Sequence, residues 1–81
     1  MKDYPIKTPQ QLGAILRGYR QEQKLTQQAI GVNAGLAQNA ISQIESNAGP
    51  ASLERIFKVL SALDLELVVR SRKSTGRQSE W

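Results

Sequence analysis

Apolar residues in the first third of the chain recur at the spacing of a helix, at i, i+3, i+4 and i+7. They form one stripe that consists of Leu12, Ile15, Leu16 and Tyr19. Thr8 precedes Pro9 and is a suitable N-cap, and Gln11 stands three residues after it, as in a capping box. The pattern predicts a helix that begins at Thr8.

Two shorter segments with apolar residues at helical spacing follow, on either side of Gly35. Thr26 can cap a helix from Gln27 to about Ala34, and Gly35 can adopt the positive φ that ends a helix tightly. A further helix is predicted from about Ala37 to Ser46. Gly31 is small where these two helices should cross. The residues expected to hold the pair against the core are Ile30, Leu36, Ile41 and Ile44.

Composition marks residues 47–50 as a loop, and Ser52 after it is a suitable cap for a fourth helix. The stripe expected on this helix consists of Leu53, Ile56, Phe57 and Leu60.

The period changes to that of a strand in LDLELVVRSR, residues 63–72, where apolar and polar positions alternate. A single strand in a helical chain has no partner within its own sequence, and an unpaired edge is a liability. The simplest partner is the same strand of a second copy, so we expect a homodimer joined by a two-stranded ribbon. The expected interface residues are Leu63, Leu65, Leu67 and Val69. A short helix of poor periodicity is the alternative.

The chain has 81 residues, which suits one small domain. Eleven Lys and Arg against seven Asp and Glu give a net charge of +4, which is compatible with a polyanionic partner or with a plain basic surface. There is no Cys and no His, so disulfides, zinc sites and Ser–His nucleophiles are excluded. We expect no cofactor, no metal, no membrane segment and a cytoplasmic location.

The two short helices around Gly35 match the helix-turn-helix unit. The second helix of that unit places its N-terminal residues against base edges in the major groove. Gln and Asn can bond adenine in a bidentate manner, and Ser accepts several partners. We therefore expect base contacts from Gln38, Asn39, Ser42 and Gln43, although a solvated polar face is the simpler reading of each residue alone. Phosphate contacts are expected around Gln27, Lys24, Ala37, Ser46 and Asn47.

The stretch LTQQAIGVNAGLAQNAISQIESN resembles the helix-turn-helix of the phage-repressor-like (Cro/cI, or Xre) family, and the resemblance covers roughly residues 10–63. It implies that Gln27 and Gln38 cooperate on one base pair, the first steadying the second and touching phosphate. It also implies an ion pair between Arg20 and Glu45. The family commonly has Ser or Thr before the recognition Gln, where this chain has Ala37.

The segment KTPQQLGAILRGYRQEQKLTQ, a helix ending in SALDLELVV and the final EW are similar to the HipB-type antitoxins. The resemblance implies a homodimer that binds palindromic operator DNA, represses its own operon and holds a HipA-like serine/threonine kinase toxin. Trp81 is the candidate toxin contact, since Trp is enriched at interface hot spots. The basic residues at 70, 72, 73 and 77 fit non-specific attraction to DNA or a protein partner, and a plain solvated tail explains them as well as those two readings together.

The expected fold is mainly α: a four- to five-helix, lambda-repressor-like domain with one C-terminal strand. Residues 1–7 form an extension, 8–63 the DNA-binding domain, 64–72 the dimerisation strand and 73–81 a tail. A stand-alone phage-type or restriction-controller repressor is the alternative function. An enzyme is disfavoured, because Asp64 and Glu66 would need a pocket to act as a carboxylate pair, and 81 residues with no His offer little to build one.

Overall fold

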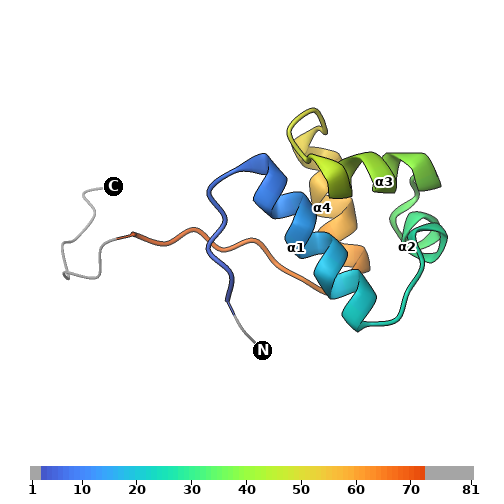
Figure 1. Cartoon of the computed structure of the whole chain (residues 1–81), viewed down its shortest axis with the longest axis horizontal. Coiled ribbons are helices and arrows are strands. Elements are labelled where there is room, and N and C mark those ends of the chain that lie inside the picture. The colour runs from blue at the N-terminus through green and yellow to red at the C-terminus, as the bar shows by residue number, and fades with distance from the viewer. Residues whose placement is uncertain (1–2, 73–81) are drawn as a thin grey trace.

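The computed structural model describes residues 3–72 and contains four helices within that range (Figure 1). They are α1 (Pro9–Glu22), α2 (Gln27–Ala34), α3 (Gln38–Ser46) and α4 (Leu53–Ala62). The structure confirms the mainly α fold and the helix-turn-helix order, with four helices out of the four to five expected.

Three of the four helices begin where the sequence supplies a capping hydroxyl. The side-chain oxygens of Thr8, Thr26 and Ser52 accept the backbone N–H of the residue three positions later, at 3.1, 3.0 and 3.2 Å. Each bond satisfies one of the N–H groups that a helix start leaves without an intrahelical partner. These caps are local, which explains why the sequence locates the helix starts.

The core lies where the four helices meet. Helix α3 packs on α1 and α2, and α2 packs on α4. The buried core residues are Leu16, Ile30, Ile41, Ile44, Ala48, Ile56, Val59, Leu60 and Leu63. Burial of this cluster fixes α3 with one apolar side inward and leaves its other side to solvent.

The apolar stripe predicted for α4 is wrong at two positions. Leu53 is 62% exposed and Phe57 is 46% exposed, whereas Val59 and Leu63 are buried. The helix turns a neighbouring face to the core, at positions 56, 59, 60 and 63. Both stripes have helical spacing, so periodicity alone could not choose between them.

Leu63 belongs to the core of its own chain, with 1% of its surface exposed, and it follows α4 directly. Its backbone carbonyl accepts a hydrogen bond from Gln23 Nε2 at 2.9 Å, which ties it to the end of α1. Its assignment to a dimer interface is therefore corrected.

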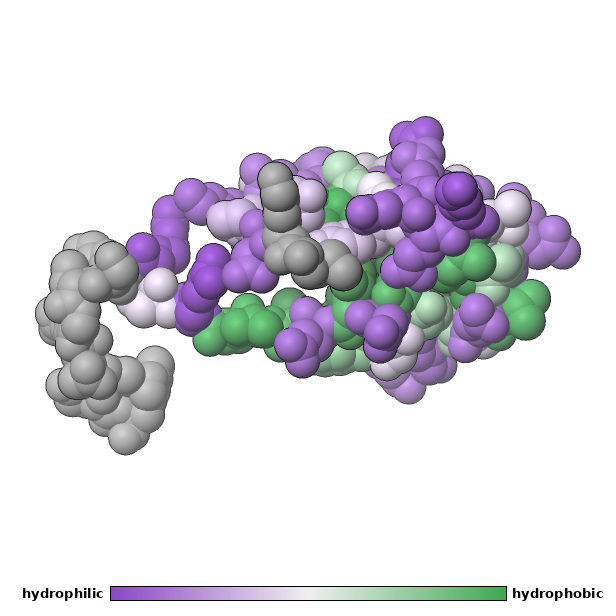
Figure 2. All heavy atoms as spheres, turned by 90° about the horizontal axis from the view of Figure 1, so that it is seen from below, coloured by the Kyte–Doolittle hydropathy of each residue, from purple (hydrophilic) through white to green (hydrophobic). Residues whose placement is uncertain are grey.

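Residues 65–71 leave the helices as a segment without regular secondary structure, and residues 3–72 contain no strand (Figure 1). A strand needs a hydrogen-bonding partner, which the single chain does not supply. Apolar surface nevertheless continues from the helices onto this segment (Figure 2), where Leu67, Val68 and Val69 are exposed, the last at 92%. At 3.4 Å, an ion pair between Arg70 and Asp3 joins this segment to the chain's N-terminal part.

Candidate nucleic-acid interface

The polar face of α3 is exposed at all four positions expected to contact bases: Gln38, Asn39, Ser42 and Gln43. Ile41 and Ile44 on the same helix are buried. The four polar residues form two pairs at i, i+4, so they share one side of the helix. The structure thus presents uncharged donors and acceptors on a single face.

The α3 N-terminus differs from those of the other helices. Ala37 occupies the N-cap position with extended backbone and makes no side-chain capping bond. Its carbonyl oxygen accepts from the N–H groups of Ala40 and Ile41, at 3.0 and 3.3 Å. The helix start next to Gln38 therefore lacks the hydroxyl that caps α1, α2 and α4.

Two glycines shape the turn between α2 and α3. Gly35 has a φ of 73°, in the left-handed region that favours glycine. A Cβ atom at Gly31 would lie 2.6 Å from the carbonyl oxygen of Leu36, closer than a real Cβ approaches. The close approach therefore requires glycine at position 31, and the backbone conformation favours glycine at position 35.

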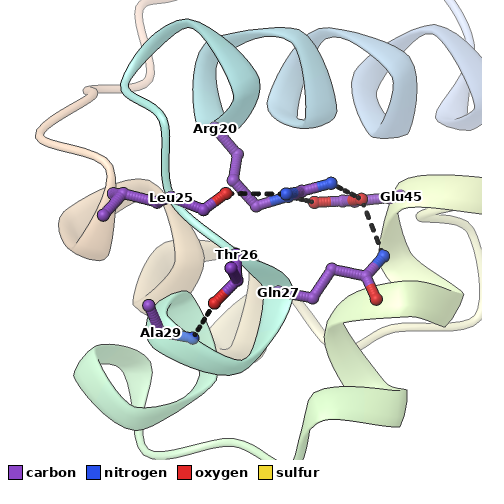
Figure 3. A network of polar contacts seen from close by, with 6 residues as sticks. All are labelled: Arg20, Leu25, Thr26, Gln27, Ala29 and Glu45. Atoms are coloured by element: carbon purple, nitrogen blue, oxygen red, sulfur yellow. Dashed lines mark hydrogen bonds and ion pairs between the residues drawn. The ribbon is translucent and has the colours of Figure 1, made fainter.

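An ion pair at the centre of the site joins the far end of α3 to α1 and α2 (Figure 3). Arg20 Nε lies 2.6 Å from Glu45 Oε2, and Arg20 Nη2 lies 3.1 Å from Glu45 Oε1. A third donor, Arg20 Nη1, reaches the carbonyl oxygen of Leu25 at 2.8 Å. Glu45 is only 9% exposed, so this bidentate contact lies in a partly desolvated place where removing one partner is costly.

Gln27 is the third member of this network. Its Nε2 donates to Glu45 Oε1 at 3.1 Å, so the carboxylate holds both Arg20 and Gln27 (Figure 3). The first residue of α2 is thereby attached to the last turn of α3. Gln27 is half-buried and its side chain is bonded to Glu45, whereas Gln38 at the other end of α3 is exposed.

The other residues expected near phosphate lie around this network. Lys24 is exposed, with a φ of 61°, in the turn after α1. Ser46 and Asn47 are exposed at the end of α3, and Asn47 Oδ1 accepts from the N–H of Gly49 at 2.9 Å.

Arg17 was not predicted from the sequence to lie at the candidate interface. It lines an open hollow of about 260 Å³ together with Arg20, Gln27, Ser42, Glu45 and Ser46. A signal was present, because Arg17 precedes Arg20 by one helical turn and shares its side of α1.

Of the remaining expectations, Leu65 is half-buried against the core, while Leu67 and Val69 are exposed. Trp81, the candidate toxin contact, lies outside the described residues. No group of three or more metal-ligating side chains occurs among residues 3–72. Within the same range no helix is long and apolar enough to cross a membrane.

Known proteins share this sequence pattern and this four-helix architecture. The helix-turn-helix family pattern matches residues 16–69. The HTH-type transcriptional regulator y4dL of Sinorhizobium fredii is 40% identical over 58 residues, which cover 72% of this chain but only 30% of that protein.

A second relative matches nearly the whole chain. The antitoxin HipB of Escherichia coli K12 is 30% identical over 74 residues, which cover 91% of this chain and 84% of HipB. A chain in a structure described as a HipA-HipB-O2-O3 complex superposes with a TM-score of 0.83 at 30% identity, covering 88% of this chain and all of that one. These relatives are regulators and antitoxins by name, not enzymes. The chain therefore belongs to the helix-turn-helix family and, within it, to the HipB-type antitoxins.

Proposed function

We propose that the chain is an antitoxin that binds palindromic operator DNA as a homodimer, represses its own operon and neutralises a HipA-like serine/threonine kinase toxin. The observation that carries the proposal is the match to HipB over 91% of the chain, together with the exposed polar face of α3. The relative's presence in a complex with HipA supports the toxin as a partner.

DNA reading rests on the chemistry of the α3 face. The amides of Gln38 and Asn39 each offer a donor and an acceptor, the pair that adenine presents at N6 and N7 in the major groove. Ser42 and Gln43 stand one turn further along the helix. The Arg20–Glu45–Gln27 network holds α3 against α1 and α2, so its exposed face is preorganised before DNA arrives.

Dimer formation rests on the segment after α4. Three consecutive exposed apolar residues, Leu67, Val68 and Val69, form a surface that a soluble chain is expected to cover. Pairing with the same segment of a second copy covers it and also satisfies the backbone groups of both strands. The two α3 helices would then enter successive major grooves about 34 Å apart, which requires a two-fold symmetric operator.

Alanine variants of two polar residues test the DNA function. We expect Gln38→Ala to lower discrimination at one base pair by about 1–3 kcal/mol. Lys24→Ala should weaken binding to all sequences and flatten the salt dependence. Gln28→Ala is the matched control, because Gln28 is exposed on α2 and outside the expected contacts. Binding titrations on a panel of single-base operator variants report both effects, and an unchanged site preference of Gln38→Ala would contradict the assigned register of α3.

A dimer test uses Leu67→Glu, which should give a monomer in analytical ultracentrifugation because a charge would be buried in the ribbon. Glu66→Gln is the control, since Glu66 is a polar, exposed neighbour. A Leu67→Glu protein that remained dimeric would remove the ribbon proposal.

The toxin is tested by affinity capture from the native host, with the full chain and with a version that ends at Arg72. Mass spectrometry should find a kinase-like protein with the full chain, and its loss on truncation would place the toxin contact in residues 73–81, where Trp81 is the expected anchor. Operator DNA without a kinase in both samples would instead establish the stand-alone repressor.

A further inference from the structure

A second hollow lies on the other side of α3, between its last two turns and the first turn of α4. It measures about 340 Å³ and is open to solvent. Ser42 and Gln43 line it, so it adjoins the face expected to contact bases. Ser46, Asn47 and Arg55 complete its polar lining. The hollow is therefore a continuation of the proposed DNA surface onto α4.

Arg55 is the charged residue of this lining. Its backbone N–H donates to Ser52 Oγ at 3.2 Å, but its guanidinium has no hydrogen-bond or ion-pair partner among residues 3–72. Arg20 in the neighbouring hollow is, by contrast, neutralised by Glu45. No carboxylate lines the hollow of Arg55, so the positive charge there is available to an incoming anion.

Two further donors stand in the same hollow. The N–H of Gly49 donates to Asn47 Oδ1 at 2.9 Å and so fixes the Asn47 side chain. The NH₂ group of the same side chain has no hydrogen-bond acceptor among residues 3–72. The Ser46 hydroxyl is exposed beside it. A guanidinium with neighbouring amide and hydroxyl donors is the set that binds a phosphodiester oxygen.

We propose that this hollow receives a backbone phosphate of the DNA and that Arg55 is a positioning residue of the protein–DNA interface. The proposal rests on the proposed DNA-binding function and extends it to α4. Arg17 lines the hollow on the α1 side of α3, and Ser42 and Ser46 line both hollows. A helix in the major groove has a phosphate backbone on each side. Arg17 on one side of α3 and Arg55 on the other are placed to meet one backbone each.

A phosphate contact has a signature that distinguishes it from base reading. Because it carries no sequence information, its loss weakens binding to every duplex by the same factor. It also removes one released counterion, so the slope of log K against log salt becomes shallower by about 0.9. We expect Arg55→Gln to show both effects.

The experiment compares Arg55→Gln with Lys58→Gln. Lys58 is exposed on the same helix one turn later and does not line the hollow, so this control removes the same net charge elsewhere. Both variants are titrated over a salt series against a duplex that the wild-type protein selects from a random pool and against a scrambled duplex. Thermal unfolding is measured alongside. Arg55→Lys should retain the salt slope, because it keeps the charge.

The outcomes distinguish a failure of the Arg55 proposal from a failure of the proposed DNA-binding function. An equal loss on both duplexes with a shallower slope for Arg55→Gln alone supports the inference. A slope equal to that of wild type or of Lys58→Gln overturns it while the DNA function stands. A loss confined to the selected duplex also overturns it, by making Arg55 a base-reading residue. A wild-type protein that selects no duplex would overturn the inference and the proposed DNA function together.

Discussion

Two glycines in α1 should respond to alanine in opposite directions, because α3 covers only one of them. A Cβ atom at Gly13 would overlap the carbonyl oxygen of Ile44 and would lie 2.7 Å from that of Glu45. A Cβ atom at Gly18 would meet nothing within 4 Å. Both residues lie inside the same helix, so the helix propensity gained by Gly→Ala is the same at both positions.

The magnitudes follow from adding the two effects. Gly→Ala inside a helix contributes about 1 kcal/mol of stability, and Gly18→Ala should gain all of it. At Gly13 the obstacle is backbone, which cannot rotate away like a side chain, so α1 and α3 must separate. Overpacking of this kind costs typically about 1–3 kcal/mol, which after the propensity gain of about 1 kcal/mol leaves Gly13→Ala destabilised by up to about 2 kcal/mol.

Urea unfolding followed by circular dichroism measures both variants, at one fixed protein concentration because a dimer's stability depends on it. In thermal unfolding, 1 kcal/mol corresponds to about 4–8 °C for a domain of this size. Gly13→Ala should also weaken DNA binding, because the displaced residues are the last turn of α3. Gly18→Ala should bind DNA normally. A Gly13→Ala protein as stable as Gly18→Ala would refute the close α1–α3 contact.

Three further substitutions test separate parts of the structure. Ala37→Ser should stabilise the protein by about 1 kcal/mol in urea unfolding, because it supplies the cap that α3 lacks; no gain would mean that the α3 start is already satisfied. Glu45→Ala should cost about 3–5 kcal/mol, because it leaves Arg20 charged and largely desolvated, whereas a cost below about 1 kcal/mol would mark the pair as a surface contact. Leu63→Ala should cost about 2–5 kcal/mol. The same cost is expected when Leu63→Ala is combined with Leu67→Glu in a monomeric protein, since Leu63 packs within its own chain. If the double variant showed no such cost, Leu63 would instead belong to the dimer interface.

The helices could be predicted from sequence because their ends are set by neighbours in the chain. Thr8, Thr26 and Ser52 each bond a backbone N–H three residues later, and Gly35 ends α2 by its own conformation. Such signals need no knowledge of the tertiary structure. The exposed face of α3 followed for the same reason, since Ile41 and Ile44 fix the opposite side.

Features that depend on other elements were harder to predict. The inward face of α4 is decided by where α2 and the core lie, and the stripe of Leu53 and Phe57 is as regular as the one that is buried. Gln27 has a partner 18 residues away that only the folded chain brings within reach. The hollow of Arg55 is formed by α3, the loop after it and the first turn of α4, which only the folded chain brings together. The proposed ribbon would need a second molecule, which a single chain does not contain.

The contacts that hold α3 are unevenly distributed along it, and this bears on how the site works. At its C-terminal end, Gly13 admits the helix backbone against α1, and Glu45 bonds to Arg20 and Gln27. At its N-terminal end, Ala37 provides no side-chain bond, and the exposed Gln38 and Asn39 follow directly. Gly31 of α2 approaches the backbone of Leu36 just before α3, so the N-terminal end of the helix is held by close packing without a side-chain bond. The polar network therefore fixes α3 from the end opposite Gln38 and Asn39. Substitutions at Gly13 or Glu45 should accordingly disturb DNA recognition as much as substitutions at Gln38, although neither residue belongs to the face proposed to contact bases.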